Sequence, residues 1–415
     1  MKVLMIHKFY YIEGGAERYM FNLSHLLQQN GVEVIPFAMK HPRNEPTPYE
    51  DFFVDYFEPD RELAKLGVLN GLKAAARVIY NTQAQRRIEA IVDETQPDLA
   101  HIHGVYHHLS PSVLFSLQRK KIPVIFTLHE YKILCPDYLF LDGQGNICEL
   151  CAGKHFWHPV VKKCFRNSLP ASLLVSVESY VHRFLKTYRN QVDLYLSPSQ
   201  FLRNKMIQYG YPEEKVAWLP YTIPMELYQP CYENDGYFVY VGRLSGEKGI
   251  KELVYAMKRI PKANLKVVGT GRLGDALKDY TVQNGMANVE FVGYKQGNEL
   301  RQIVRRAMCV VVPSVVYDNS PLSIYEAFAH GKPVIGATIG GIPELVDEGK
   351  DGYLYRAMDE DSLVEALHNA WEQQFAIPQM GRHAREKAER LFSPEAHLSK
   401  IKEIYRRFTG SSVSI

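Results

Sequence analysis

Short runs of apolar residues alternate with longer segments of mixed polarity along most of the chain. The short runs are apolar at nearly every position, as expected of strands buried on both faces of a parallel sheet. The longer segments repeat their apolar residues at helical spacing, which is typical of crossover helices. The predicted strands are at 2–7, 32–39, 99–104, 122–129, 192–197, 216–220, 237–242, 264–269, 289–293, 308–312 and 333–337.

Helices are predicted between these strands. They are at 16–29, 248–259, 273–284, 297–307, 321–330 and about 394–409. The alternation predicts an α/β protein, and so many strands fit two doubly wound parallel sheets better than one. Prolines interrupt every pattern between Leu219 and Gly236, which indicates a hinged linker. We therefore predict a first domain over 1–218 and a second one that begins at 219.

Composition narrows the class of protein. The 415 residues include 23% charged and 46% hydrophobic residues, and the net charge is +3. These values are ordinary for a soluble globular protein and give no electrostatic footprint for nucleic acid, so no nucleic-acid partner is expected. No apolar stretch is long enough to cross a membrane, and Met1 leads into the first strand without a signal peptide. We expect a cytoplasmic protein, with attachment to the inner face of the cell membrane left open.

Two carboxylates stand at the end of one predicted strand. Asp318 lies in the loop after 308–312, and Glu326 lies on the helix that follows. The carboxyl ends of strands are where open α/β sheets bind ligands. The helix start between the two acids, at 319–321, would offer free N–H groups to an anion, phosphate above all. The two carboxylates could therefore hold one phosphate-bearing ligand.

Glycines and cations occur at three other strand-to-helix turns. Gly14 and Gly15 precede the first predicted helix and would allow a positive φ and the close approach of an anion. Arg243 and Lys248 flank a turn in the second half, where diphosphate is the natural partner. Gly271 follows another strand in the same way. Each feature alone is weak evidence for a phosphate site, because such glycines often serve only to form turns and such cations are often solvated surface charges.

Three histidines lie at or near the ends of predicted strands, at His101, His103 and His129. A lone histidine on a strand is more often structural than catalytic. The concentration of polar groups at this edge of the sheet favours a functional interpretation.

Four cysteines lie in the segment 131–170, which breaks the alternation of strands and helices. Cys135, Cys148, Cys151 and Cys164 form the pattern C-x12-C-x2-C-x12-C. The central pair has the spacing of metal ligands, so four thiolates could hold a structural Zn²⁺. Reduced free thiols and labile disulfides are the alternatives, and a nearby histidine could replace one ligand.

Two segments, 61–87 and 168–190, combine apolar residues with Lys and Arg. Either could lie on an anionic membrane and present a lipid-linked acceptor. An ordinary amphipathic helix packed on the core explains the same pattern, and we favour it.

Taken together, these motifs resemble those of the family-4 retaining glycosyltransferases of the GT-B fold over nearly the whole chain. The family's Gly-Gly-Ala-Glu turn matches 14–17, its Gly-Arg…Glu-Lys-Gly segment matches 242–249, and its paired acids match Asp318 and Glu326. An Ala-x-Ala-x-Gly-x-Pro-Val segment follows at 327–334. Family members normally have Glu as the first acid. Asp318 is one methylene shorter, which shortens its reach toward the sugar.

The resemblance implies two Rossmann-like domains facing across a cleft, 1–218 on the acceptor side and 219–390 on the donor side, with 391–415 packing back on the first domain. It implies transfer of a sugar, with the anomeric configuration retained, from a nucleotide diphosphate sugar to a hydroxyl acceptor. A glycan or lipid-linked oligosaccharide in cell-surface polysaccharide synthesis is the expected acceptor. No metal or other cofactor is expected in catalysis. The cysteine segment 131–170 resembles an insertion found in a subset of bacterial polysaccharide glycosyltransferases.

The same resemblance implies roles for individual residues. Glu326 would bind the ribose and Asp318 the hydroxyls of the transferred sugar. His129 would lie near the anomeric centre and His103 in the acceptor cleft. The diphosphate would be bound by the remaining donor-site residues, which are Gly14, Gly15, Arg243, Lys248, Gly271, Ser320, Pro321 and Leu322. No protein base is implied, because the departing phosphate would deprotonate the acceptor.

Four other interpretations use the same motifs. A catalytically silent GT-B carbohydrate-binding protein is disfavoured by the presence of Arg243, Lys248 and Glu326. A GT-B nucleotide-sugar epimerase is disfavoured by the paired acids beside these cations, and a phosphorylase by the lack of a pyridoxal-phosphate lysine signature. A Rossmann oxidoreductase is disfavoured because the first turn lacks the G-x-G-x-x-G spacing.

Overall fold

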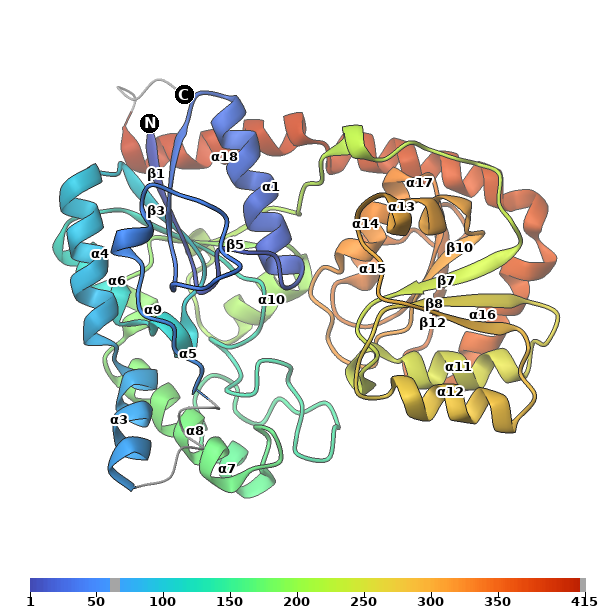
Figure 1. Ribbon diagram of the computed structural model, residues 1–415, viewed down its shortest axis with the longest axis horizontal. Coiled ribbons are helices and arrows are strands. Elements are labelled where there is room, and N and C mark those ends of the chain that lie inside the picture. Colours follow the sequence, from blue (N-terminus) through green and yellow to red (C-terminus); the bar gives the residue numbers. More distant parts are fainter. Residues whose placement is uncertain (60–67, 411–415) are drawn as a thin grey trace. The chain divides into compact units, whose positions relative to one another are not determined.

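The computed structural model of the protein describes residues 1–59 and 68–410, which form two compact units (Figure 1). The first unit contains Met1–Leu219 and Leu398–Ile415, and the second contains Pro220–His397. Each unit is built on one sheet of six parallel strands. Helices connect the strands in both units, so the predicted α/β class is confirmed.

The sheet of the first unit has the strand order β2-β1-β3-β4-β5-β6. Its strands are β1 Lys2–His7, β2 Glu33–Phe37, β3 Leu99–Gly104, β4 Val124–Thr127, β5 Leu194–Ser197 and β6 Val216–Trp218. Its helices are α1 Gly15–Gln29, α3 Val68–Ile79, α4 Thr82–Thr95, α5 Tyr106–Leu109, α6 Ser112–Arg119, α7 His158–Lys162, α8 Leu169–Phe184, α9 Thr187–Asn190 and α10 Gln200–Gln208. Strands β3, β4 and β5 are buried at every position, which explains their continuously apolar or weakly polar sequences.

The sheet of the second unit has the strand order β12-β11-β10-β7-β8-β9. Its strands are β7 Tyr237–Val241, β8 Asn264–Val268, β9 Val289–Gly293, β10 Cys309–Val312, β11 Val334–Ala337 and β12 Gly352–Tyr355. Its helices are α11 Ile250–Lys258, α12 Gly274–Gln283, α13 Gly297–Arg306, α14 Leu322–Ala329, α15 Ile342–Leu345, α16 Glu360–Glu372 and α17 Ile377–Leu391. Short 3-10 helices are at Glu50–Phe52, Glu213–Lys215, Met225–Leu227, Gly246–Lys248 and Gln374–Ala376.

All eleven predicted strands are present, within a few residues of their predicted ends. The edge strand β12 was not predicted, because it is only four residues long and begins with a glycine. The helix predicted over 248–259 begins later, at Ile250. Gly249 has a φ of +67°, and this left-handed residue separates α11 from the 3-10 turn that carries Lys248.

The chain returns to the first unit through α18, Pro394–Thr409, which is long and lies at the C-terminus in Figure 1. The return begins at Leu398, later than the predicted residue 391. The backbone carbonyl of Phe392 explains the delay, because it accepts hydrogen bonds from the backbone of Ile223 and the hydroxyl of Thr222 within the second unit. The last five residues of the predicted segment, 411–415, lie outside the described residues.

The cysteine-containing segment follows β4 and contains α7 and an isolated antiparallel bridge between Leu141 and Ile147. Of the segment 61–87, which was considered for membrane contact, residues 61–67 lie outside the described residues. Among the helices in the described ranges, none combines the length and the apolar character needed to span a bilayer.

Candidate functional site

Three loops meet at the carboxyl ends of the strands in the second unit, and two glycines permit their close approach. A Cβ at Gly249 would lie 1.7 Å from the carbonyl oxygen of Pro313, so the loop after β7 rests against the end of β10. A Cβ at Gly340, whose φ is +60°, would lie 2.3 Å from the carbonyl oxygen of Asp318. Gly341 also donates its backbone N–H to that oxygen at 2.8 Å. The loop after β11 is thereby fixed against Asp318.

Lys248 and Asp318 meet in this group of loops. The Nζ of Lys248 lies 2.6 Å from the Oδ2 of Asp318, which also accepts a hydrogen bond from the hydroxyl of Ser314 at 2.8 Å. Burial alone would raise the pKa of Asp318, but Lys248, Ser314 and the more distant Arg243 outweigh it and hold that pKa below its ordinary value. The Lys248 and Asp318 side chains expose 30% and 12% of their surfaces, so a ligand can reach both.

Arg243 extends from the loop after β7 and exposes 74% of its side chain. Its nearest carboxylate is Glu247, at 3.5 Å. Glu247 also accepts a hydrogen bond from the hydroxyl of Ser245 at 2.6 Å. Of the predicted cations, Lys248 is therefore held by Asp318 and Arg243 is the more accessible. Gly271, in the loop after β8, packs against the backbone of Leu244 in the same group of loops.

Glu326 lies on α14, and the structure gives it a different partner from Asp318. Its Oε1 accepts a hydrogen bond from the hydroxyl of Tyr228 at 3.2 Å, and the residue is buried. Asp318 is thus held by Lys248 and Glu326 by Tyr228, and both acids follow the carboxyl end of β10 in the chain. Tyr228 was missed in the sequence because it lies in the proline-rich linker, where no periodicity marks it.

The start of α14 differs slightly from the prediction. The helix begins at Leu322, and Pro321 is its N-cap. The hydroxyl of Ser320 lies 2.6 Å from that of Tyr325, and both residues are buried. The side chain of Ser320 is therefore engaged with its own helix. Its contribution to anion binding would come from the backbone N–H groups that begin the helix.

In the first unit, Gly14 and Gly15 stand at the start of α1. Gly14 is the N-cap with an extended φ of −155°, and neither glycine has a positive φ. The positive φ that these glycines would allow is not used at this turn. The N–H of Gly14 is donated to the carboxylate of Glu17 at 2.9 Å, and Glu17 in turn lies 3.5 Å from the imidazole of His7. Gly14 and Glu17 thus form a capping box, and anion binding at this helix start stays a prediction.

The three histidines form a connected row at the ends of β3 and β4. The Nε2 of His129 lies 3.0 Å from the Nδ1 of His103, whose ring centroid is 4.3 Å from that of His101. His101 is hydrogen-bonded to Thr127 and to Tyr405 of α18, both at 2.7 Å. Burial, with His7 and Lys8 nearby, lowers the pKa of His129 to about 3. Burial also lowers the pKa of His103, so the imidazoles of His103 and His129 are neutral at physiological pH.

Glu130 was not singled out in the sequence, although it directly follows His129 at the end of β4. Burial raises the pKa of its carboxyl group, against the opposing effect of Lys8 and Lys132. A carboxyl group of this kind is a candidate proton acceptor. Its position next to a strand-end histidine is the signal that could have identified it.

The four cysteines of the 131–170 segment are free thiols. Burial, followed by the neighbouring thiols of Cys164 and Cys148, raises the pKa of Cys151 to about 12. Cys135 is buried and also lies near Cys151. Within residues 1–59 and 68–410, no three or more His, Cys, Asp or Glu side chains are arranged to hold a metal ion. The zinc site stays a prediction.

Comparison with known proteins decides the family. A family model described as Glycosyltransferase Family 4 matches residues 13–227, which is more than half of the 415-residue chain. The chain belongs to glycosyltransferase family 4. A second model, described as Glycosyl transferases group 1, matches residues 235–373 of this glycosyltransferase. The two matches together cover both units.

Individual relatives agree with this assignment. The glycosyltransferase is 23% identical over 410 residues to an uncharacterized glycosyltransferase, MJ1178, of Methanocaldococcus jannaschii, covering 99% of both chains. It is 25% identical over 236 residues to the amylovoran biosynthesis glycosyltransferase AmsK of Erwinia amylovora, covering 52% of this chain and 57% of that protein. The structure of Anabaena HepE in complex with UDP and glucose matches with a TM-score of 0.66 at 18% identity, covering 98% of this chain and 100% of that one. The chain therefore has the GT-B fold of these enzymes.

Proposed function

We propose that the protein transfers a sugar from a nucleotide diphosphate sugar to a hydroxyl group, with retention of the anomeric configuration. The observation that carries this proposal is the accessible Lys248–Asp318 pair, with Arg243 exposed nearby. In a nucleotide sugar the diphosphate is directly attached to the transferred sugar. Lysine and arginine suit the anionic diphosphate, and an ionised aspartate suits the sugar hydroxyls. UDP and glucose bound by HepE support this class of donor.

Positive charge for the departing diphosphate would come from the protein. Arg243, Lys248 and the backbone at Ser320–Leu322 would stabilise the charge that develops as the glycosidic bond breaks, so the proposal needs no catalytic metal. Glu326, positioned by Tyr228, would bind the ribose. The neutral His129 would lie near the anomeric centre, with His103 behind it.

No protein base is included, because the departing phosphate would accept the proton of the acceptor hydroxyl. Glu130, with its raised pKa, is the residue best suited to act as a protein base, so its substitution tests this part of the proposal. We expect Glu130→Gln to lower kcat by less than about tenfold, since loss of a general base typically costs 10²- to 10⁴-fold. A loss of about 100-fold or more in this isosteric variant would identify Glu130 as the base instead.

The acceptor proposed is a glycan or a lipid-linked oligosaccharide in cell-surface polysaccharide synthesis. AmsK supports this choice, since that relative acts in amylovoran biosynthesis. Purified protein should release nucleoside diphosphate slowly from one of a panel of nucleotide sugars, and EDTA should not change the rate. NMR of the product formed with a hydroxyl acceptor should show the donor's anomeric configuration. Tight binding of a nucleotide sugar with neither hydrolysis nor transfer would instead indicate a catalytically silent protein.

A structural zinc ion remains a separate proposal for Cys135, Cys148, Cys151 and Cys164. It is supported by the central C-x2-C pair and by the closeness of the thiols within one segment. The four thiols are not arranged around a common point, so metal binding would have to draw them together. Elemental analysis of protein purified without chelators should find about one zinc per chain. Protein that is folded and active without zinc would refute the proposal.

A further inference from the structure

Helix α8 of the first unit has its polarity reversed. Its buried face carries Ser172, Val175, Ser176, Glu178 and His182. Its exposed face carries Leu169, Leu173, Val177, Tyr180 and Phe184, which recur at helical spacing and which we call the α8 stripe. Phe184 alone exposes 87% of its surface. The core-helix interpretation favoured in the sequence is wrong for this segment, because the apolar side chains face outward.

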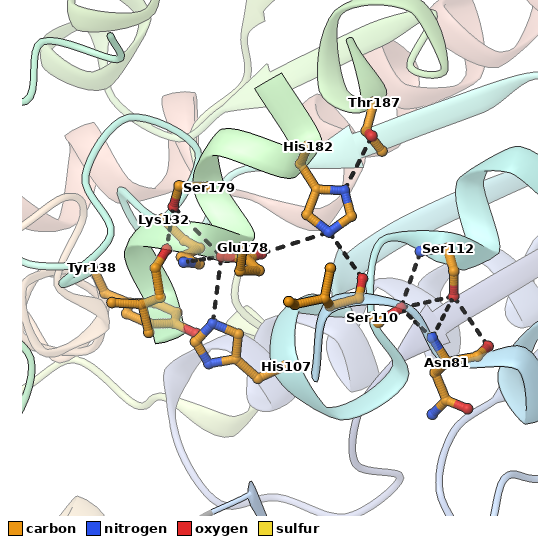
Figure 2. Close-up of polar contacts among 12 residues, drawn as sticks. Asn81, His107, Ser110, Ser112, Lys132, Tyr138, Glu178, Ser179, His182 and Thr187 are labelled. Carbon is orange, nitrogen blue, oxygen red and sulfur yellow. Dashed lines mark hydrogen bonds and ion pairs between the residues drawn. The ribbon is translucent and has the colours of Figure 1, made fainter. Parts of the chain in front are cut away.

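A buried network of polar groups fixes this orientation (Figure 2). Glu178 accepts a hydrogen bond from the Nζ of Lys132 at 2.6 Å, and the two side chains expose 1% and 2% of their surfaces. His182 is held by the hydroxyl of Thr187 at 3.1 Å and by the carbonyl of Ile79 at 3.0 Å. Turning the stripe inward would expose Glu178 and leave Lys132 buried without its partner. The outward position of the stripe is therefore a consequence of the packing beneath it.

Positive charge accompanies the stripe. Residues 150–190 contain seven Lys and Arg but a single acid, Glu178, which is buried. Lys163 and Arg166 precede the stripe, and Lys186 follows it, and all three are exposed. A cavity of about 680 Å³ opens beside the end of α8, and its lining includes Lys154, Arg183, Lys186 and Arg189 together with tyrosines. The surface around the stripe thus complements negative charge.

We propose that the α8 stripe docks this protein onto the surface of an anionic phospholipid bilayer. An apolar helical face flanked by Lys and Arg is typical of helices that lie in the membrane interface. Val161 of α7 and Trp157, which precedes that helix, are exposed too. Tryptophan is enriched at the level of the lipid headgroups in membrane proteins. The cationic side chains meet lipid phosphates while the stripe enters the acyl boundary. Docking would bring the first unit to lipid-linked acceptors and in that respect deepens the proposed function, but binding itself needs no transferase activity.

Co-sedimentation of the full chain with lipid vesicles tests the docking. The protein should sediment with vesicles containing phosphatidylglycerol at low salt, less so at high salt, and weakly with vesicles of phosphatidylcholine alone. The variant Leu173→Ser/Phe184→Ser should bind anionic vesicles about tenfold or more weakly, since it removes two large apolar side chains from the contact. The matched control is Val282→Ser/Phe375→Ser, which removes two apolar side chains of the second unit that are 80% and 85% exposed, against 52% and 87% for Leu173 and Phe184. It should bind like the unsubstituted protein.

Two outcomes would overturn the proposal. One is failure of the unsubstituted protein to bind anionic vesicles at low salt, and the other is equal binding by the stripe variant, once circular dichroism melting shows that it is folded. If the protein instead forms dimers that the stripe variant abolishes, and ignores vesicles, the stripe is an interface between two copies. Donor hydrolysis without vesicles should be the same in all variants. Vesicle binding without any donor hydrolysis would refute the proposed function and leave the docking intact.

Discussion

Each unit holds a lysine and a carboxylate 2.6 Å apart, Lys248 with Asp318 in the second and Lys132 with Glu178 in the first. The side chains of the accessible pair, Lys248–Asp318, expose 30% and 12% of their surfaces. Those of the buried pair, Lys132–Glu178, expose 2% and 1%. In both pairs the carboxyl pKa is lowered although burial opposes it, because the lysine, together with other neighbouring groups, outweighs the cost of burial.

The difference in exposure gives the two pairs opposite consequences. A solvent-accessible pair contributes little to stability, but either partner can exchange the other for an incoming ligand. A buried pair cannot exchange, and removal of one partner leaves an uncompensated charge in the interior. The same two groups at the same distance therefore suit ligand binding in the second unit and orient a helix in the first.

Loss of the lysine from the accessible pair should have the largest effect on activity. We expect Lys248→Ala to lower kcat roughly 100- to 1,000-fold, as removal of one preorganised charge-stabilising group does elsewhere. The free energy of unfolding should change by less than about 1 kcal/mol. Steady-state kinetics and urea denaturation measure the two effects. Lys262→Ala, an exposed lysine of the same unit, is the control, and near-normal turnover of Lys248→Ala would remove this pair from the site.

The buried pair should show the reverse behaviour. Lys132→Met should lower the free energy of unfolding by about 3–5 kcal/mol, because the buried Glu178 loses its lysine and is left with the more distant His107 and His182, at 3.7 and 3.8 Å. Replacing both partners, in Lys132→Met/Glu178→Leu, should recover most of that loss. Urea denaturation of the single and double variants measures the coupling. If the single variant is as stable as the unsubstituted protein, the pair does not hold α8.

The row of histidines should make the stability of the first unit depend on pH. His129 has a pKa of about 3 in the folded protein and about 6.5 when unfolded, so the unfolded state binds the proton first as pH falls. Above pH ~6.5 the group contributes no pH dependence, and between ~6.5 and ~3 stability should fall by up to about 1.4 kcal/mol per pH unit. His129→Gln should flatten this slope. His25→Gln, at an exposed site in the same unit, should leave it unchanged.

The smallest effect on activity is expected at Asp318, where the motif that the chain resembles has Glu. Asp318→Glu adds one methylene, which is worth about tenfold in discrimination between substrates, and should change kcat/KM by no more than that. Its interest lies in the ranking of donor sugars, compared in parallel assays of the two proteins. An unchanged ranking would mean that the length of this acid does not select the donor.

The sequence predicted more of the second unit than of the first. Continuous apolar strands and the turns around Arg243, Lys248 and Asp318 are local signals, and their placement at one edge of the sheet follows from parallel topology. The direct pairing of Lys248 with Asp318 and the support from Tyr228 are not local, so spacing could not reveal them.

In the first unit, partners distant in the chain decided the outcome. The period of α8 was readable, but the choice of its buried face depended on Lys132, which is 46 positions from Glu178. At α1 the carboxylate of Glu17 accepts a hydrogen bond from the N–H of Gly14 and is close to His7, which lies ten positions earlier in the chain. Hydrogen bonds and ion pairs between side chains that are distant in the chain produce no repeating pattern in the sequence.

Helix α18 sets an order on the completion of the two units during synthesis. The second unit is one continuous stretch of chain, whereas the first is completed only by a segment that follows the second unit in the sequence and begins at Leu398. Ile401 and Tyr405 are fully buried in the first unit, and Tyr405 holds His101 at the centre of its sheet. The unit that is begun first is therefore completed only after the second unit has been made, and His101 lacks its Tyr405 partner until then.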